Sequence, residues 1–152
     1  MTYHWMALPY LMMRTLKFET IKTFTDITTD VQNLIPKNFC GAIHVFSKHT
    51  TSCIRILEDE ILLKADYTNF LEKIAPKDGH YQHNHVGIRD VPPGERINGH
   101  SHIRTLFFPT SETIPVQDGK LVLGKWQTLF LVELDPSRER EVIITLLSEA
   151  SA

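Results

Sequence analysis

The sequence has little that would place it in a specialised class of protein. Its two cysteines, Cys40 and Cys53, are too few for a disulfide framework, and each lies in or beside an apolar run, which predicts buried free thiols in a reducing compartment. The net charge of −2 gives no electrostatic reason to expect binding to nucleic acid or to an anionic membrane surface. We therefore expect a cytoplasmic protein with no nucleic-acid partner and no membrane partner.

The chain also lacks a recognisable targeting or membrane-spanning segment. Residues 1–13 are largely apolar, but Pro9 interrupts them, no basic region precedes them and no small-residue cleavage site follows. The run is too short to cross a bilayer. No internal repeat, linker or low-complexity tract divides the rest, and 152 residues is the size of one ordinary domain. We expect an N-terminal extension over residues 1–13 and a single domain over residues 14–150.

What the sequence does contain is a series of alternating and helical hydrophobic patterns. Alternation predicts strands over residues 15–22, 41–47, 52–57, 111–115, 121–123, 126–134 and 141–147. Apolar spacings of three and four predict helices over residues 28–35 and 59–74, and residues 101–108 can form a short helix or a turn. The Asp118-Gly119 step is a strong hairpin signal. The predicted fold class is α+β, a largely antiparallel or mixed sheet with a few helices packed on it.

Five of the eight histidines fall between residues 80 and 102, and these are His80, His83, His85, His100 and His102. The segment between the two groups is rich in glycine and proline, so it can sustain neither a helix nor a central strand. Imidazole is the commonest protein metal ligand and the usual acid or base near neutral pH. Any one of these histidines is explained well enough as a surface residue, but the cluster predicts a functional site on a loop.

Three further side chains are candidates for that site. His49 lies between two predicted strands, where it can face a cleft or simply occupy a turn. Glu58 follows a strand and precedes a helix, so it can act as a base, a metal ligand or a helix cap, whereas Glu60 is better explained as a charge at a helix N-terminus. Asp66 lies in the middle of the predicted helix, where a solvated acidic face is an equal explanation.

Two or three histidines with a carboxylate have the composition of a catalytic site for Zn²⁺ or a similar divalent metal. The sequence has no HExxH and no paired CxxC pattern, however, so spacing alone does not establish a metal. If residues 100–102 are helical, His100 and His102 point to different faces and only one of them reaches the site. Arg138 and Arg140 can bind phosphate or carboxylate, or pair with Glu133 and Asp135 at a surface.

Together these residues resemble a known family. In chain order the shared features are His49-Thr50-Thr51, Glu58, Asp66, Tyr81 with His83, Asn98 with His102, Ile114-Pro115-Val116, Asp118-Gly119, Leu123-Gly124, Trp126-Gln127, Glu133, Asp135, Arg138 and Arg140. Their joint pattern is similar to that of the YjbQ-like family, also called the secondary thiamine-phosphate synthase family. The resemblance runs from about residue 16 to residue 147.

The resemblance implies a homotrimer with a histidine-containing pocket near the subunit boundaries and often a bound divalent metal. It also implies a weak thiamine-phosphate synthase activity, which joins a pyrimidine diphosphate to a thiazole phosphate with loss of pyrophosphate, beside a physiological role that is not settled. The residues that match the family's site are His49, His83 and His102 as metal ligands, with Glu58, Asp66 and Asn98 as polar site residues. His44, His80, His85 and His100 have no such match.

Some positions depart from the family pattern. Ser52 replaces an alanine after His-Thr-Thr, and residues 99–101 and 107–109 replace small or flexible stretches, which alters the surroundings of His49 and His102 more than the fold. In the implied reaction, Arg138, Lys125 or a cation held by the histidines would neutralise the pyrophosphate leaving group. Two alternatives use the same residues: a non-catalytic trimer that binds a metal or a phosphorylated ligand, and a metal-assisted hydrolase.

Overall fold

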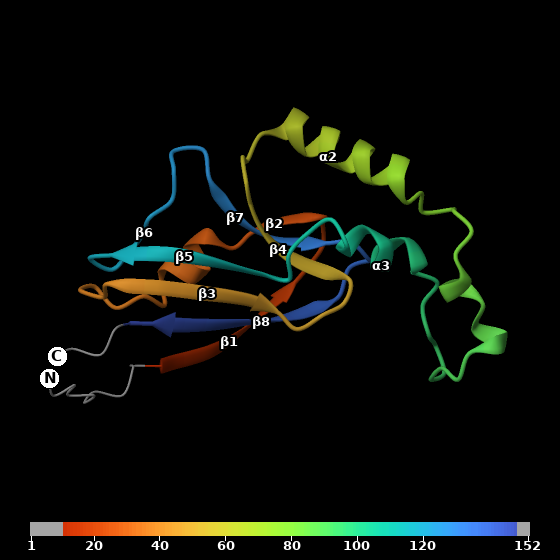
Figure 1. Cartoon of the computed structure of the whole chain (residues 1–152), viewed down its shortest axis with the longest axis horizontal. Coiled ribbons are helices and arrows are strands. Elements are labelled where there is room, and N and C mark those ends of the chain that lie inside the picture. The colour runs from red at the N-terminus through yellow and green to blue at the C-terminus, as the bar shows by residue number, and fades with distance from the viewer. Residues whose placement is uncertain (1–10, 149–152) are drawn as a thin grey trace, which may run out of the picture.

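A computed structural model describes residues 11–148, and it is an α+β fold as the sequence predicts (Figure 1). The eight strands form two antiparallel sheets. The five-stranded sheet runs in the order β1 (Leu11–Glu19), β8 (Glu139–Leu147), β3 (Gly41–Ser47), β5 (Ser111–Gln117) and β6 (Lys120–Leu121). The three-stranded sheet consists of β2 (Phe24–Asp26), β7 (Thr128–Glu133) and β4 (Ser52–Leu57). The two sheets are joined by the short connections between β3 and β4 and between β7 and β8.

The larger of two hydrophobic clusters is built from both sheets. In β3 the alternation places Ile43 and Val45 on the buried face, while His44 lies on the half-exposed face. Leu129 and Leu131 of the second sheet pack in the same cluster, and both are fully buried. α1 (Thr28–Gln32) closes it by burying Val31. Because the apolar face of each strand is buried between the sheets, this burial determines which way a polar residue at a strand end points.

The longest helix, α2 (Ile61–Ile74), lies over the three-stranded sheet (Figure 1). Glu60 caps it, because the Glu60 carboxylate accepts hydrogen bonds from the backbone N–H groups of Leu62 (2.8 Å) and Leu63 (2.7 Å). These bonds hold the pKa of Glu60 below its usual range. Leu71 anchors the helix in the second hydrophobic cluster, beside Phe130. The prediction that Glu60 serves the helix N-terminus is confirmed.

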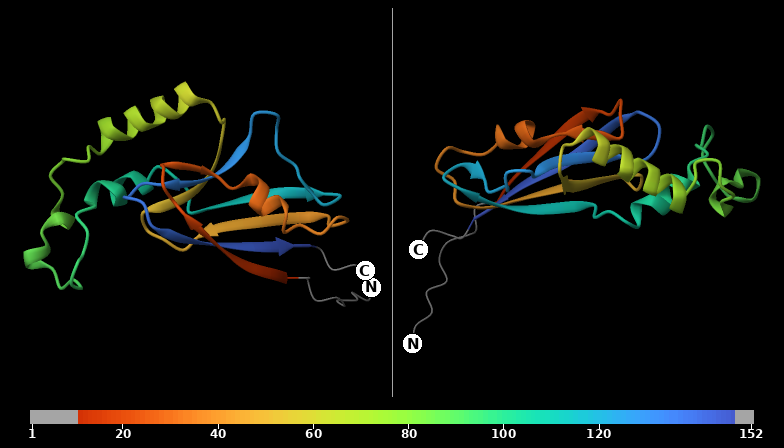
Figure 2. Two further views of the ribbon diagram at one scale, coloured as in Figure 1. Left: turned by 180° about the vertical axis from the view of Figure 1, so that it is seen from behind. Right: turned by 90° about the horizontal axis from the view of Figure 1, so that it is seen from above.

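The chain after α2 runs out beyond the sheets and returns. It forms two short 3-10 turns, η1 (Gln82–Asn84) and η2 (Val86–Ile88), and then α3 (Gly99–Thr105). This excursion lies at the end of the molecule opposite the start of β1 and the end of β8 (Figures 1 and 2). The predicted loop is thus confirmed between the two histidine groups, but His100 and His102 belong to a helix.

Two sequence expectations need correction, and one strand was not predicted. β1 covers Leu11–Glu19, whereas the predicted strand covers residues 15–22. Residues 11–13, which the sequence assigned to an N-terminal extension, pair with β8, and residues 1–10 lie outside the described residues. Cys53 is buried, and burial raises the pKa of its thiol to about 12, but Cys40 is exposed. β2 has only three residues, too few for an alternation pattern to show, and its pairing with β7 was not predicted.

Within residues 11–148, no helix is long and apolar enough to cross a bilayer.

Candidate functional site

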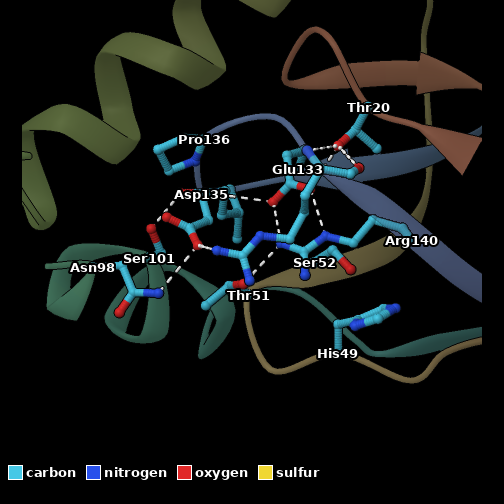
Figure 3. Close-up of polar contacts among 12 residues, drawn as sticks. Thr20, His49, Thr51, Ser52, Asn98, Ser101, Glu133, Asp135, Pro136 and Arg140 are labelled. Carbon is cyan, nitrogen blue, oxygen red and sulfur yellow. Dashed lines mark hydrogen bonds and ion pairs between the residues drawn. The ribbon is translucent and has the colours of Figure 1, made fainter. Parts of the chain in front are cut away.

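A buried ion pair joins the two sheets at the end nearest the histidine excursion. Arg140 of β8 donates from Nε (2.6 Å) and from an Nη (2.5 Å) to the two carboxylate oxygens of Glu133 in β7. Both residues are less than 5% exposed. Such a bidentate pair is the strongest geometry available to these groups, and Figure 3 shows it at the centre of the polar contacts. The sequence raised this pairing as a surface contact; the pairing is right and the surface location is wrong.

Hydroxyl groups complete the coordination of the pair. Thr20 donates to Glu133 (2.8 Å), and Thr51 accepts from Arg140 (2.9 Å). The segments that carry these threonines follow β1 and precede β4, so four parts of the chain meet at one carboxylate and one guanidinium. Ser47 and Ser52 form a second contact between the sheets, with their hydroxyl oxygens 2.7 Å apart. Buried charges that are paired and hydrogen-bonded in this way are stable in a protein interior.

His49 lies on the turn between β3 and β4, close to the ion pair (Figure 3). Its Nε2 accepts a hydrogen bond from the backbone N–H of Glu141 (2.8 Å), so Nε2 carries the lone pair and not the proton. Burial, followed by the nearby charge of Arg140, lowers the pKa of His49. The ring is therefore neutral near pH 7, and its Nε2 is already engaged with the backbone.

A second buried carboxylate lies beside the first. The Asp135 side chain accepts from Nδ2 of Asn98 (3.1 Å) and pairs with Arg138 through the same oxygen, Oδ2. Arg96 approaches that oxygen to 3.9 Å. Within the described part of the chain, Asp135 Oδ1 and Arg138 Nε are buried without a hydrogen-bond partner. Two predicted site residues, Asn98 and Arg138, thus meet at a carboxylate that still has an unused oxygen.

The helical geometry of α3 separates its two histidines. His102 lies against His83 of η1, with ring centroids 4.5 Å apart, whereas His100 faces Tyr81 at 6.5 Å and is buried. Burial, and then the neighbouring His83, lower the pKa of His102. Nε2 of His83 is buried and has no partner among residues 11–148. The structure therefore brings together two of the three predicted metal-ligating histidines.

The remaining candidates lie elsewhere. Glu58 and Asp66 are exposed, and neither makes a side-chain hydrogen bond or ion pair within the described residues. Lys125 stacks its Nζ over the ring of Trp126 at 4.6 Å, in the loop between β6 and β7. That loop rises from the sheets well away from η1 and α3 (Figures 1 and 2). In one copy of the chain, these three residues do not meet the histidine pair.

A metal needs more ligands than the pair supplies. Residues 11–148 contain no group of three or more His, Cys, Asp or Glu side chains placed to hold a metal ion. His49 has a different set of charged neighbours, Arg140, Glu133 and Glu141, from those of His102. The described residues of one chain thus supply two adjacent imidazoles, those of His83 and His102, and no complete set of metal ligands.

The sequence analysis gave Arg140 too little weight, although a signal for it is present. Arg140, Val142 and Ile144 alternate along β8 and all point to the buried face, so the period-two pattern includes the arginine. Glu133 closes the apolar run of β7 in the same way. Ser101, fully buried in α3, has no comparable signal in the sequence, because a small polar residue beside two histidines is common on a surface.

Two antiparallel sheets joined by a buried carboxylate–guanidinium pair, with a histidine-bearing turn and helix at one end, define a small α+β domain of a distinct class. The family model described as UPF0047 protein YjbQ-like matches residues 14–149. The chain belongs to this YjbQ-like, UPF0047 family, as the sequence pattern predicts.

Relatives support the same assignment. A UPF0047 protein of Methanothermobacter thermautotrophicus is 35% identical over 123 residues, which cover 80% of this chain and 80% of that protein. The UPF0047 protein YjbQ of Salmonella typhimurium is 30% identical over 127 residues, covering 82% of this chain and 86% of that protein.

Solved structures agree with the fold. A YbjQ-like protein of unknown function from Sulfolobus solfataricus superimposes with a TM-score of 0.79 at 28% identity, covering 93% of this chain and 100% of that chain. A hypothetical protein from Aeropyrum pernix also gives a TM-score of 0.79 at 28% identity, covering 91% and 99%. The family is thus one of uncharacterised proteins, and activity has to be argued from this site.

Proposed function

We propose that this protein binds a phosphorylated small molecule at the end of the domain formed by η1 and α3, and that a weak thiamine-phosphate synthase activity arises there. The observation that supports this is the contact of His83 with His102, next to the Asn98, Asp135 and Arg138 group. Imidazoles and arginines in one place suit a phosphorylated ligand, because an imidazole can bind a phosphate-bound metal and an arginine can pair with the phosphate charge.

Arginines supply the charge that a diphosphate leaving group requires. Arg138 is one-third exposed, and its Nε has no partner within residues 11–148. Arg96 approaches the same Asp135 oxygen, Oδ2, to 3.9 Å, and Arg89 donates to the backbone carbonyl of His83. Asp135 orients Arg138, and Asn98 in turn donates to Asp135. We assign phosphate neutralisation to Arg138 and positioning to Asn98 and Asp135.

A divalent metal is part of the proposal, with His83 and His102 as its ligands from this chain. Such an ion would neutralise phosphate oxygens and polarise the bond to the leaving group. The remaining ligands would come from the phosphate itself or from a neighbouring copy, because one copy contributes only two imidazoles. His49, with its Nε2 bonded to Glu141, would have to join from another subunit or after losing that bond.

We also propose that the protein works as a cytoplasmic homotrimer, as the family resemblance implies. Assembly could bring together candidates that lie apart in one copy, such as His49, Glu58 and Asp66. Both the metal and the trimer are open to direct measurement.

The metal proposal is tested by elemental analysis of protein purified without an affinity tag. We expect close to one divalent ion per chain in the wild type. In His83→Ala and His102→Ala the affinity should fall on the order of tenfold or more, so that at least about 80% of the metal is lost. His80→Ala, which changes an exposed histidine of the same excursion, is the control and should keep the metal. Wild-type protein without metal would contradict this part of the proposal.

The activity is tested by adding hydroxymethylpyrimidine diphosphate and thiazole phosphate and following pyrophosphate release. Arg138→Met should lower the rate by about 100-fold, because removing one oriented donor from a developing charge typically has that effect. Binding of both substrates without turnover would leave a non-catalytic ligand-binding protein. Metal-dependent hydrolysis of simple phosphate esters, with no coupling of the two substrates, would replace the synthase with a hydrolase.

A further inference from the structure

A cavity of about 280 Å³ opens between α2, α3 and the segment that follows β7. Its walls include Thr68 and Leu71 of α2, His100 and Arg104 of α3, and Asp135 after β7. Pockets for small molecules usually measure about 300–1,000 Å³, so this one suits a small occupant. Asp135 is the only residue of its lining that the proposed function uses.

Two residues of its lining each carry a buried hydrogen-bond acceptor that has no partner within the described residues. The acceptors are Oδ1 of Asp135 and Nδ1 of His100, and both residues are more than nine-tenths buried. Oδ2 of Asp135 is fully engaged by Asn98 and Arg138, so only Oδ1 remains open. A buried acceptor left unsatisfied costs free energy, which a donor on a ligand would recover.

Ser101 fixes which nitrogen of His100 is the acceptor. The Ser101 hydroxyl has one proton, and it donates that proton to the backbone carbonyl of Leu134. Its contact with Nε2 of His100 (3.1 Å) therefore requires Nε2–H to donate to the serine oxygen. The neutral ring then carries its lone pair on Nδ1, which is the unpartnered atom. The cavity thus offers a nitrogen lone pair and a carboxylate oxygen.

The other acidic residue of the wall does not add a third open acceptor. Both oxygens of Glu133 are bonded, Oε1 to Arg140 and the backbone N–H of Asp135, and Oε2 to Arg140 and Thr20. Its charge is balanced by Arg140. An occupant therefore needs two hydrogen-bond donors, one for Nδ1 of His100 and one for Oδ1 of Asp135.

Two cationic side chains, those of Lys77 and Arg104, line the cavity beside the Glu72 carboxylate. Lys77 is exposed there and makes no ion pair within residues 11–148. Arg104 donates from Nε to the backbone carbonyl of Ala75 (3.0 Å) and from one terminal nitrogen to Glu72. Its other terminal nitrogen remains for a ligand. Two cations beside a small polar cavity favour an anionic group at the entrance.

From these contacts we propose that the cavity is a binding site for a small phosphate monoester that carries at least two hydrogen-bond donors, either hydroxyl or ammonium groups. The phosphate binds Lys77 and Arg104, and the donors bind Nδ1 of His100 and Oδ1 of Asp135. Because the turn of α3 separates His100 from His102, this site is distinct from the His83–His102 pair. It shares only Asp135 with the proposed function, which uses the other carboxylate oxygen, Oδ2.

Isothermal titration of the full chain with ribose 5-phosphate and with phosphoethanolamine tests the site. At least one of the two should bind at least tenfold more tightly than inorganic phosphate or free ribose, and Lys77→Ala and His100→Gln should each weaken it about tenfold. Glutamine keeps a donor to Ser101 but lacks the Nδ1 acceptor. Lys73→Ala removes an exposed lysine that does not line the cavity, so it should bind like the wild type.

Three results would overturn the proposal: no binding of either ester, binding no tighter than that of inorganic phosphate, or binding that Lys77→Ala leaves unchanged. Lys77 is exposed, so its variant folds even if His100→Gln does not. His83→Ala should bind the esters normally, because it alters only the other site. A loss of ester binding in His83→Ala would contradict the separation of the two sites.

Discussion

Glu133 and Arg140 form a contact that is far more demanding than a surface ion pair. Both side chains are buried, and their partners are each other, two threonines and, for Glu133, the backbone N–H of Asp135. The stability that such a pair adds relative to an apolar pair can be small, but removing one member leaves an isolated buried charge. The pair therefore acts as a constraint on how the two sheets meet.

Arg140→Met should destabilise the protein by about 3–5 kcal/mol, as measured by urea unfolding, because Glu133 is left charged and buried. The double variant Glu133→Gln/Arg140→Met should recover part of this loss. The surface pair of Arg55 and Glu112 (3.0 Å) is the matched control, and Arg55→Met should cost about 0–1 kcal/mol. Equal losses for the two arginines would show that burial of the pair has no energetic importance.

Histidine burial predicts how stability depends on pH. The pKa values of His49, His100 and His102 all lie below the ordinary 6.5, with burial as the main cause. Below about pH 6.5 the unfolded chain therefore binds protons that the folded protein does not, so protonation favours unfolding. The contribution of these histidines to the free energy of unfolding is fully present above that pH and is lost as the pH falls.

Urea unfolding at several pH values between about 7.5 and 5.5 measures this effect. His49→Gln should show a shallower fall in the free energy of unfolding than the wild type. His85→Gln, which changes an exposed histidine, serves as the control for any general effect of losing an imidazole. A wild-type stability that rises as the pH is lowered through this range would contradict the argument.

At the level of single residues, the sequence singled out Asn98, Arg138, His83 and His102. The structure places Asn98 and Arg138 against Asp135, and His83 against His102. The sequence could not place Glu58 or Asp66, because a carboxylate after a strand or on a helix has the same pattern whether it faces solvent or a ligand. It also left His100 without a role. Only the three-dimensional position of Ser101 shows which nitrogen of that ring is open.

Strands and helices were easier to predict than their pairing. Alternation located β3 and β4 to the residue, and the three-four spacing located α2 within two residues. The division into two sheets did not follow from these patterns, since β2 is short and pairs with β7 more than 100 residues later in the chain. Pairing over such a separation depends on tertiary packing, which local periodicity does not record.

The hairpin between β5 and β6 gives a prediction at this scale. Asp118 and Gly119 have φ values of 50° and 74°, as in a tight hairpin turn, and a Cβ on Gly119 would lie 2.4 Å from the carbonyl oxygen of Lys37. Gly119→Ala should therefore lower stability by at least about 1 kcal/mol in thermal unfolding.

Gly124→Ala is the control for that measurement. Gly124 has no positive φ, and a methyl group added there would meet, as its nearest neighbour, the flexible end of the Gln127 side chain at 3.3 Å. Its substitution should change stability by about 0.5 kcal/mol or less. A destabilised Gly124→Ala beside an unaffected Gly119→Ala would contradict the role of the turn.

The whole molecule leaves an apolar surface around α2 and α3. Phe70 and Phe107 pack edge to face at 6.2 Å, yet each is half-exposed, and Leu106 beside them is more exposed still. Exposed patches of large apolar side chains commonly mark protein interfaces. This surface is the place where we expect copies of the chain to meet in the proposed trimer.

Sedimentation equilibrium should give three times the mass of the chain. Leu106→Asp should raise the dissociation constant of the trimer by about tenfold or more, so that smaller species are populated. Ile21→Asp, at an exposed apolar residue of the loop after β1, should leave the mass unchanged. A monomeric wild type would contradict the trimer, and a trimer unaffected by Leu106→Asp would place the interface elsewhere.

The pairing of β1 with β8 determines how the fold would respond to mechanical force. Leu11 faces Leu147 and Glu19 faces Glu139, so the first and last described strands are antiparallel neighbours with their outer ends side by side. A pull on those ends loads one pair of residues at a time, because ladder hydrogen bonds run perpendicular to the strands. The β1–β8 pairs would therefore separate one after another at low force, starting at Leu11 and Leu147. The end of the molecule that carries η1 and α3 would be loaded last.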